Sequence, residues 1–189
     1  REQYALASAS PVGILGGGPG VGKTWTVAQV IKSLVFNFGA QYLAICAPTG
    51  KAAQRVNELL VEHGIGFIKA STIHRLLQVQ RNGRDGNGWG FRYGRSEALP
   101  YRFIIIDESS MLSTNLLASL LAATRPGTHV LFVGDFEQLA PVDHGAPLRD
   151  MISAGLPYGL LTEPRRNEGD IARNCSAVCR GRLYRPPPA

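Results

Sequence analysis

Cysteine, charge and long apolar runs are all scarce in this sequence, and each shortage narrows what the protein can be. Its three cysteines, Cys46, Cys175 and Cys179, form no CxxC pair and leave one over, which favours a reducing cytoplasm and a buried strand position for Cys46. No apolar stretch approaches the roughly 20 residues of a membrane span. The start, REQYALASAS, lacks the apolar region of a secretory signal. We therefore expect a cytoplasmic protein without a membrane-spanning segment.

The bulk composition predicts one compact domain with a basic surface. Hydrophobic residues make up 44% of the 189 residues and charged residues only 18%, which suits a single full-sized core and excludes a disordered chain. The net charge of +6 favours a polyanionic partner. Only four of the 20 basic residues are lysine, so a compositional bias toward arginine explains the charge equally well. Charge alone therefore leaves nucleic-acid binding open.

Apolar runs and amphipathic segments alternate along the chain. Four runs are typical of buried parallel strands, because each is continuous and ends at Gly, Pro or Asp: 12–16, 42–46, 102–107 and 129–135. Helical spacing follows in three segments, 22–37, 50–62 and 113–123, with Gly39 and Gly64 as expected stops. This alternation predicts an α/β fold with a mostly parallel central sheet flanked by helices.

One segment, residues 78–96, interrupts this alternation. It holds Asn-Gly and Asp-Gly dipeptides, which favour tight turns, and then Trp89, Phe91 and Tyr93 at the spacing of a strand. We expect an inserted β-hairpin whose aromatic side chains either stack on bases or, as we favour, pack on their own domain. We assign residues 1–180 to one domain and the Arg- and Pro-rich residues 181–189 to the start of a linker.

The stretch GGGPGVGKT, residues 16–24, contains the pattern GxxxxGK[ST] between an expected strand and an expected helix. Glycines let backbone N–H groups curl around phosphates, and the positive end of the helix points at the same phosphates. Lys23 is expected to reach the β- and γ-phosphates, and the Thr24 hydroxyl to hold Mg²⁺. A chance Gly-rich turn is the alternative. The predicted nucleotide-binding residues are Gly17, Gly18, Pro19, Gly20, Val21, Gly22, Lys23 and Thr24.

A pair of carboxylates follows the apolar run FIII, residues 103–106. We expect Asp107, at the end of that strand, to hold Mg²⁺ through water, and Glu108 to polarise an attacking water as a catalytic residue. A kinase does not need such a water activator. Taken alone, the pair is also compatible with an ordinary acidic strand end.

A third signal, GDFEQLAPV at 134–142, follows another buried strand. We predict that Gln138 contacts the γ-phosphate or the attacking water and reports its presence to the rest of the domain. Asp135 is expected to support the metal shell. On physical grounds alone this motif also fits an ordinary turn.

Six motifs in order resemble the first RecA-like domain of superfamily 1 DNA helicases, with the RecD-like branch closest. They are GGPGVGKT, APTGKAAQRV, STIHRLL, IIIDESSML, GDFEQLAPV and LTEPRRN, and the similarity covers nearly the whole chain. The resemblance implies a RecA-like P-loop ATPase domain with ATP and Mg²⁺ as cofactors, which drives translocation on single-stranded DNA and unwinding in the full-length protein. It also implies roles in DNA repair and recombination, with nuclease or repair subunits as partners.

Further nucleotide contacts are implied by the resemblance alone. Gln3 lies upstream of the phosphate loop, where the family has a glutamine that reads adenine. Arg166, with Arg165 as its neighbour, matches a catalytic arginine that touches the γ-phosphate. Trp25 stands where the family has a small or hydroxylated residue, and we expect it to fill core volume.

The resemblance also implies DNA-binding residues. Thr49 and Gly50 match a segment that contacts the backbone of single-stranded DNA, and Thr72 and His74 match a second segment. From the residues alone, Thr49 and Gly50 serve equally well to cap a helix, and His74 equally well as a structural histidine.

Superfamily 1 helicases have a second RecA-like domain, and nothing after residue 170 is long enough to encode it. We therefore expect the N-terminal motor half of a helicase, with weak ATP hydrolysis and no duplex unwinding by this chain alone. A stand-alone PhoH-like ATPase and a nucleotide-gated DNA-binding or loading subunit remain the alternatives. The helicase-type motifs argue against the first, and Glu108 argues against the second. A small-molecule kinase would need an acceptor pocket and a lid, and we see neither.

Overall fold

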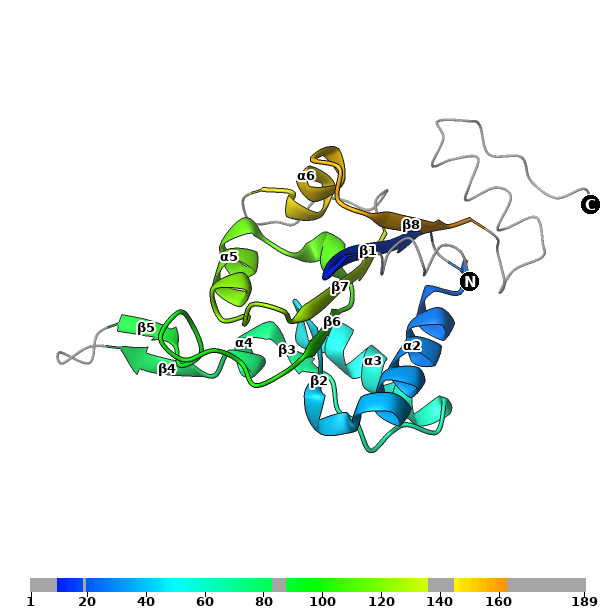
Figure 1. Cartoon of the computed structure of the whole chain (residues 1–189), viewed down its shortest axis with the longest axis horizontal. Helices are drawn as coiled ribbons and strands as arrows, with labels where there is room; N and C mark the ends of the chain where they lie inside the picture. The colour runs from blue at the N-terminus through cyan, green and yellow to red at the C-terminus, as the bar shows by residue number, and fades with distance from the viewer. Residues whose placement is uncertain (1–9, 19, 83–87, 136–144, 163–189) are drawn as a thin grey trace, which may run out of the picture.

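A computed structural model describes residues 10–18, 20–82, 88–135 and 145–162 of the chain, and within them a six-stranded parallel sheet forms the centre (Figure 1). The strand order is β3-β2-β6-β7-β1-β8, and every neighbouring pair is parallel. The strands span Val12–Gly17 (β1), Leu43–Ala47 (β2), Ser71–Thr72 (β3), Phe103–Ile106 (β6), His129–Gly134 (β7) and Tyr158–Leu161 (β8). The expected mostly parallel α/β sheet is confirmed.

Two hydrophobic cores cover the two faces of this sheet. Successive strand residues point to opposite faces, so Ile104 and Ile106 belong to one core and Ile105 to the other. Helices α2 (Lys23–Phe38) and α3 (Gly50–Glu62) pack on the face of Ile105, whereas α4 (Ile73–Leu76), α5 (Thr114–Ala122) and α6 (Pro147–Ser153) contribute to the opposite core. Because both faces are covered, the strands read as continuous apolar runs.

Helix boundaries lie within one residue of the expectation. Gly39 is the C-cap of α2, and Gly64 follows the C-cap of α3; both have positive φ angles. Cys46 is buried in β2 as expected, and burial raises the pKa of its thiol to about 12. The sequence interpretation did not foresee β3, α6 and β8. No helix of the described residues has the length and apolar character needed to cross a bilayer.

The expected hairpin is present as β4 (Val79–Asn82) and β5 (Gly88–Phe91), an antiparallel pair that projects from the domain (Figure 1). Phe91 packs on the core, but Trp89 is 72% exposed because the strands extend beyond the domain surface. The Arg81 guanidinium lies 5.6 Å from the Trp89 ring centre. The aromatic stripe therefore packs on its own domain only near its base.

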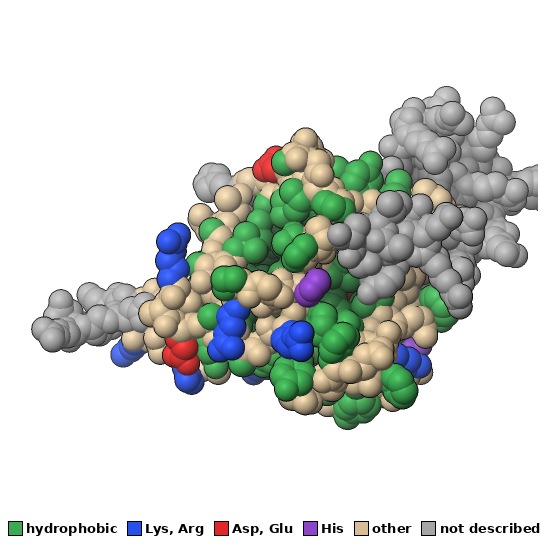
Figure 2. Space-filling view, viewed as in Figure 1, with side chains coloured by type: hydrophobic (Ala, Val, Ile, Leu, Met, Phe, Trp, Pro, Cys, Tyr) green, Lys and Arg blue, Asp and Glu red, His purple; other side chains and the backbone are tan. Residues whose placement is uncertain are grey.

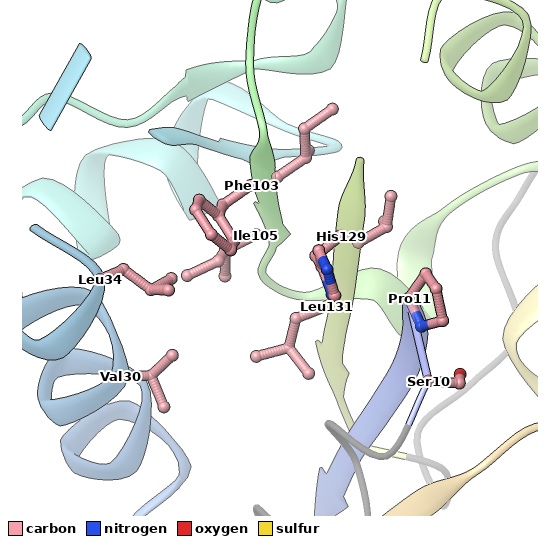
Figure 3. A pocket seen from close by; sticks show the side chains of 10 residues that line it. Ser10, Pro11, Val30, Leu34, Phe103, Ile105, His129 and Leu131 are labelled. Atoms are coloured by element: carbon pink, nitrogen blue, oxygen red, sulfur yellow. The ribbon is translucent and has the colours of Figure 1, made fainter. Parts of the chain in front are cut away.

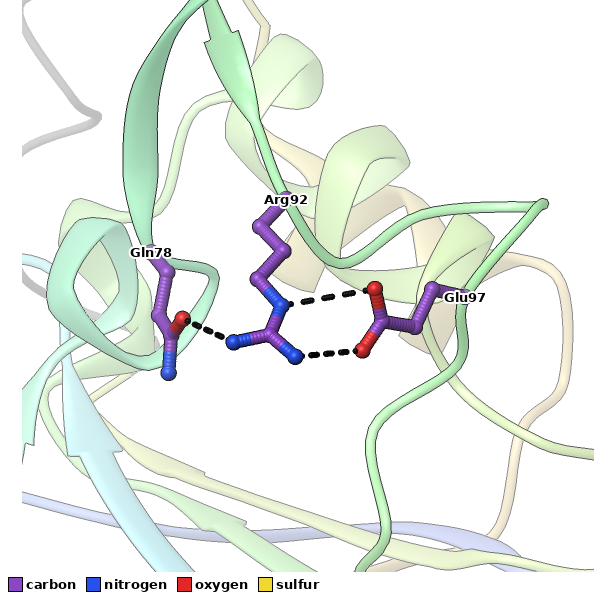
Figure 4. Close-up of polar contacts among 3 residues, drawn as sticks. All are labelled: Gln78, Arg92 and Glu97. Atoms are coloured by element: carbon purple, nitrogen blue, oxygen red, sulfur yellow. Dashed lines mark hydrogen bonds and ion pairs between the residues drawn. The ribbon is translucent and has the colours of Figure 1, made fainter.

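A polar cluster closes the base of this hairpin. The Arg92 guanidinium donates to the Glu97 carboxylate at 2.9 Å and to the Gln78 side-chain oxygen at 3.2 Å (Figure 4). The Arg92 N–H also donates to the Gln78 carbonyl at 2.9 Å. Gln78 itself has a φ angle of 54°, in the left-handed region that non-glycine residues rarely adopt. These contacts turn the chain sharply out of α4 into the hairpin.

Candidate nucleotide and nucleic-acid site

The candidate site lies along the carboxyl edge of the parallel sheet, where every strand ends on the same side. The strand order places Thr72, the last residue of β3, and Thr49, which follows β2, at one end of this edge. Asp107 follows β6 in the middle, and the phosphate loop follows β1 toward the other end. Strand β7 separates β6 from β1, so Asp107 and the loop face each other across one strand rather than as direct neighbours. Ligand sites in open parallel sheets occur at this edge.

The phosphate loop turns tightly from β1 into α2. A Cβ on Gly17 would lie 2.7 Å from the Leu161 carbonyl oxygen and 2.6 Å from a Val21 methyl, so only glycine fits between β1 and β8. Gly22 caps α2 with a φ of 81°, and neither a side-chain cap nor an acidic residue occupies the first turn. The N–H groups and positive dipole of a 16-residue helix are thus presented to an anion.

The Lys23 ammonium lies back on the loop. It donates to the carbonyl oxygens of Gly17 and Gly18, the second at 2.8 Å. These carbonyls hold the charge at the mouth of the loop, where phosphate oxygens are the stronger acceptors for an ammonium.

Thr24 and Asp107 both line one small pocket of about 10 Å³ between α2 and α3, and the other residues that line it are aliphatic. Burial raises the pKa of the Asp107 carboxyl from 3.8 to about 6, and the neighbouring Glu108 charge adds to this rise. The Glu108 N–H and the positive charges of Lys23 and Arg55 act in the opposite direction. A hydroxyl and a carboxylate beside a phosphate loop are the oxygen donors that Mg²⁺ prefers, so these residues fit that ion.

Glu108 adopts a strained backbone conformation, with φ 51° and ψ 38° in the left-handed region. The buried Ser109 hydroxyl beside it donates to the Val133 carbonyl at 2.8 Å, at the end of β7. A Cβ on Gly134 would lie 2.9 Å from that hydroxyl, which explains the glycine of the GD motif. The acid pair is therefore packed against the strand that leads to Asp135, which is 3% exposed.

The expected DNA-contacting residues gather at the β2–β3 end of the edge. Thr49 caps α3 by accepting from the Ala52 N–H at 3.2 Å, and Thr72 caps α4 by accepting from the Arg75 N–H at the same distance. Gly50 is exposed at the first position of α3. His74 is exposed, with its ring centre 5.7 Å from that of Phe91. Helix capping is therefore present at both threonines, and it leaves their surfaces available to a backbone phosphate.

Several predicted residues lie outside the described part of the chain: Gln3, Pro19, Gln138, Arg165 and Arg166. The expectation that Trp25 fills core volume is wrong, because its side chain is 47% exposed on the first turn of α2. Sequence reasoning also missed Ser109 and Leu161. Nothing in the sequence distinguishes Ser109 from its neighbour Ser110, and nothing marks Leu161 as the neighbour of the loop.

A separate cavity of about 80 Å³ opens at the opposite, amino edge of the sheet (Figure 3). Apolar side chains of α2, such as Leu34, line it together with Phe103 and His129 at the starts of β6 and β7. It lies one strand length from the phosphate loop, so it is not part of the nucleotide site. Within the described residues no group of three or more His, Cys, Asp or Glu side chains forms a metal cluster.

Comparisons with known proteins agree with this geometry. The family model described as an AAA domain matches residues 1–144. The chain is 44% identical over 154 residues to the ATP-dependent RecD2 DNA helicase of Deinococcus radiodurans, covering 81% of this chain and 19% of that protein. It is 36% identical over 167 residues to the RecBCD enzyme subunit RecD of Mycobacterium tuberculosis, covering 80% of this chain and 28% of the relative.

A solved structure of Bacteroides Pif1 bound to single-stranded DNA shares the fold, with a TM-score of 0.56 at 19% identity over 90% of this chain and 43% of that one. The chain spans less than a third of the length of the two curated relatives. The chain belongs to the AAA domain family and, within it, to the RecD-like motor domains of superfamily 1 helicases.

Proposed function

We propose that this chain binds ATP with Mg²⁺ at the phosphate loop, hydrolyses it, and couples hydrolysis to single-stranded DNA as the motor domain of a RecD-like helicase. The observation that carries the proposal is that Thr24 of the loop and Asp107 of the acid pair line one pocket, with Lys23 beside them. One relative is named an ATP-dependent DNA helicase and another a subunit of the RecBCD enzyme. Both names support the same activity, and the second supports a setting in an enzyme of several subunits.

Each residue has a distinct task in this proposal. The loop N–H groups and Lys23 bind the phosphates, while Thr24 and Asp107 hold the metal ion, which when bound neutralises charge on the β- and γ-phosphates. Glu108 accepts a proton from the attacking water. Gln138 and Arg166 complete the γ-phosphate contacts, and Gln3 reads adenine.

Single-stranded DNA is assigned to the β2–β3 end of the carboxyl edge. Thr49, Gly50, Thr72 and His74 lie there, separated from the phosphate loop by β6 and β7. Because the acid pair lies between the two sites, movement of the strand ends can connect DNA binding to hydrolysis. Because residues 1–189 span less than a third of the length of the two helicase relatives, we propose that on their own they hydrolyse ATP weakly and do not unwind duplex DNA.

The test compares ATP hydrolysis by the wild-type chain and by Glu108→Gln, with and without an oligothymidine of about 15 nucleotides. We expect DNA to accelerate the wild type, and Glu108→Gln to lower the rate about 100-fold or more while a fluorescent ATP analogue still binds. The matched control is Glu62→Gln, an exposed carboxylate at the far end of α3. Full activity in Glu108→Gln would contradict the proposed role of this residue.

A further inference from the structure

Helix α3 and strand β3 are joined by a side chain that none of the six sequence motifs explains. The Asn57 amide donates to the Ala70 carbonyl at 3.0 Å, and its oxygen accepts from the Ala70 N–H at 2.8 Å. Both polar groups of one backbone residue, 13 positions away in the chain, are thus satisfied by one side chain. The Asn57 side chain thus makes the two hydrogen bonds that a neighbouring strand would otherwise make to Ala70.

Strand β3 depends on such an anchor. It consists of only Ser71 and Thr72, and it lies at the edge of the sheet, where β2 is its single strand neighbour. The preceding segment is held to the core by Ile65 and Ile68, both buried, but Lys69 is exposed. Ala70 is therefore the last point at which the chain is fixed before it enters β3.

The same bonds connect the two segments assigned to DNA. Asn57 lies on α3, the helix that Thr49 caps, and Ala70 is two residues before Thr72. Ala47 of β2 pairs in register with Thr72, and Thr49 follows Ala47 by two residues. Fixing Ala70 to α3 therefore sets the position of Thr72 relative to Thr49.

We propose that Asn57 is a positioning residue for single-stranded DNA, which holds the Thr49–Gly50 and Thr72–His74 segments at the spacing that one DNA backbone requires. The inference rests on the proposed function, since it concerns the same DNA path. Asn57 itself does not contact DNA. Its loss removes both hydrogen-bond partners of the buried Ala70 backbone, and β3 then shifts along β2 without any change at the phosphate loop.

The test measures binding of a fluorescein-labelled oligothymidine of about 15 nucleotides and, separately, of a fluorescent ADP analogue by anisotropy. We expect Asn57→Ala to weaken DNA binding about five- to tenfold and to leave ADP binding within about twofold of the wild type. Hydrogen exchange of residues 66–76 should accelerate, whereas that of α2 should not. The control is Gln54→Ala on the same helix, because among the hydrogen bonds of the described residues the Gln54 side chain bonds only Glu58, also on α3, at 3.1 Å.

Unchanged DNA affinity in Asn57→Ala would overturn the inference, and so would an equal loss of DNA and ADP affinity, which a merely structural role produces. If Asn57→Ala does not fold, Asn57→Gln decides by the same criteria, because it keeps the uncharged amide but displaces it by one methylene; the expected DNA loss is then about two- to threefold. A wild-type chain that binds ADP but no oligothymidine contradicts the DNA part of the proposed function, and the inference with it.

Discussion

At the residue scale, the candidate site is a set of charges held where water is scarce. The Asp107 carboxyl lies partly buried between α2 and α3, and its raised pKa measures the cost of keeping it ionised there. Glu108 adds a backbone in the left-handed region. Backbone strain and desolvation of this kind are typical of functional sites. A bound ligand offsets their free-energy cost, because it interacts with the buried charge.

Replacing Lys23 tests the phosphate loop directly. Lys23→Met should weaken binding of a fluorescent ATP analogue about 10- to 100-fold, because it removes a charge-assisted hydrogen bond to phosphate. Its ammonium is held only by the Gly17 and Gly18 carbonyls among the hydrogen bonds of the described residues, so the fold should persist. Lys32→Met, exposed on the same helix, is the control. Equal affinities of the two variants for the ATP analogue would show that Lys23 does not contribute to nucleotide binding.

The raised pKa of Asp107 predicts how stability depends on pH. The carboxyl is easier to protonate in the folded than in the unfolded chain, so its destabilising effect is absent below pH 3.8 and complete above about pH 6. Asp107→Asn should therefore stabilise the ligand-free fold by about 1–2 kcal/mol near pH 8, and by less as the pH falls toward about 5. Thermal melts at the two pH values check this. With Mg²⁺ and nucleotide added, the wild type should become more stable than Asp107→Asn, because a carboxylate binds Mg²⁺ more strongly than the amide that replaces it.

At the scale of elements, strand packing decides which loop residues are replaceable. Gly17 pairs with Leu161 in the β1–β8 ladder and has no room for a side chain, whereas a Cβ on its neighbour Gly18 would meet nothing within 4 Å. The two glycines look equivalent in the sequence. The packing of β8 and of the Val21 side chain against Gly17 distinguishes them.

Alanine substitutions at Gly17 and Gly18 measure how much a side chain at each position destabilises the domain. Gly17→Ala should destabilise the domain by about 2–3 kcal/mol, because β1 and β8 must move apart to admit the methyl group. Gly18→Ala should change the free energy of unfolding by less than about 0.5 kcal/mol. Urea denaturation of both variants without nucleotide measures the difference. Similar midpoints would show that β8 does not press on the loop.

At the scale of the whole molecule, charge and strand order act together. The chain carries a net charge of +6, and on the face seen in Figure 2 basic side chains are more prominent than acidic ones. The sheet order places the proposed DNA segments and the phosphate loop on one edge, on either side of the acid pair. One domain thus carries both proposed anion-binding regions, with the carboxylate pair between them.

Salt should affect these two regions differently. If the chain neutralises about three DNA phosphates, its affinity for oligothymidine should fall about 10- to 20-fold between 50 and 200 mM salt. Binding of an ADP analogue should change much less, since it depends on directed hydrogen bonds in a partly buried loop. Anisotropy titrations at several salt concentrations provide both slopes. A DNA affinity independent of salt would contradict backbone recognition.

The sequence by itself determined most of the element types and predicted the chemistry. Continuous apolar runs favour strands buried on both faces, and GxxxxGKT between a strand and a helix predicts an anion site, because these patterns depend on residues that are near one another in the chain. The roles of Gln138 and Arg166, which lie outside the described residues, remain predictions from their motifs.

Only the tertiary structure decided which of these local pieces meet. Three contacts join residues that are distant in the sequence: β7 lies between β1 and β6, Leu161 packs on Gly17, and Asn57 bonds Ala70. The exposure of Trp25 likewise depends on how the layers pack. Such contacts depend on strand order and on the volumes available between packed layers. The local pattern of a sequence does not encode either quantity, so these relations appear only once the chain is folded.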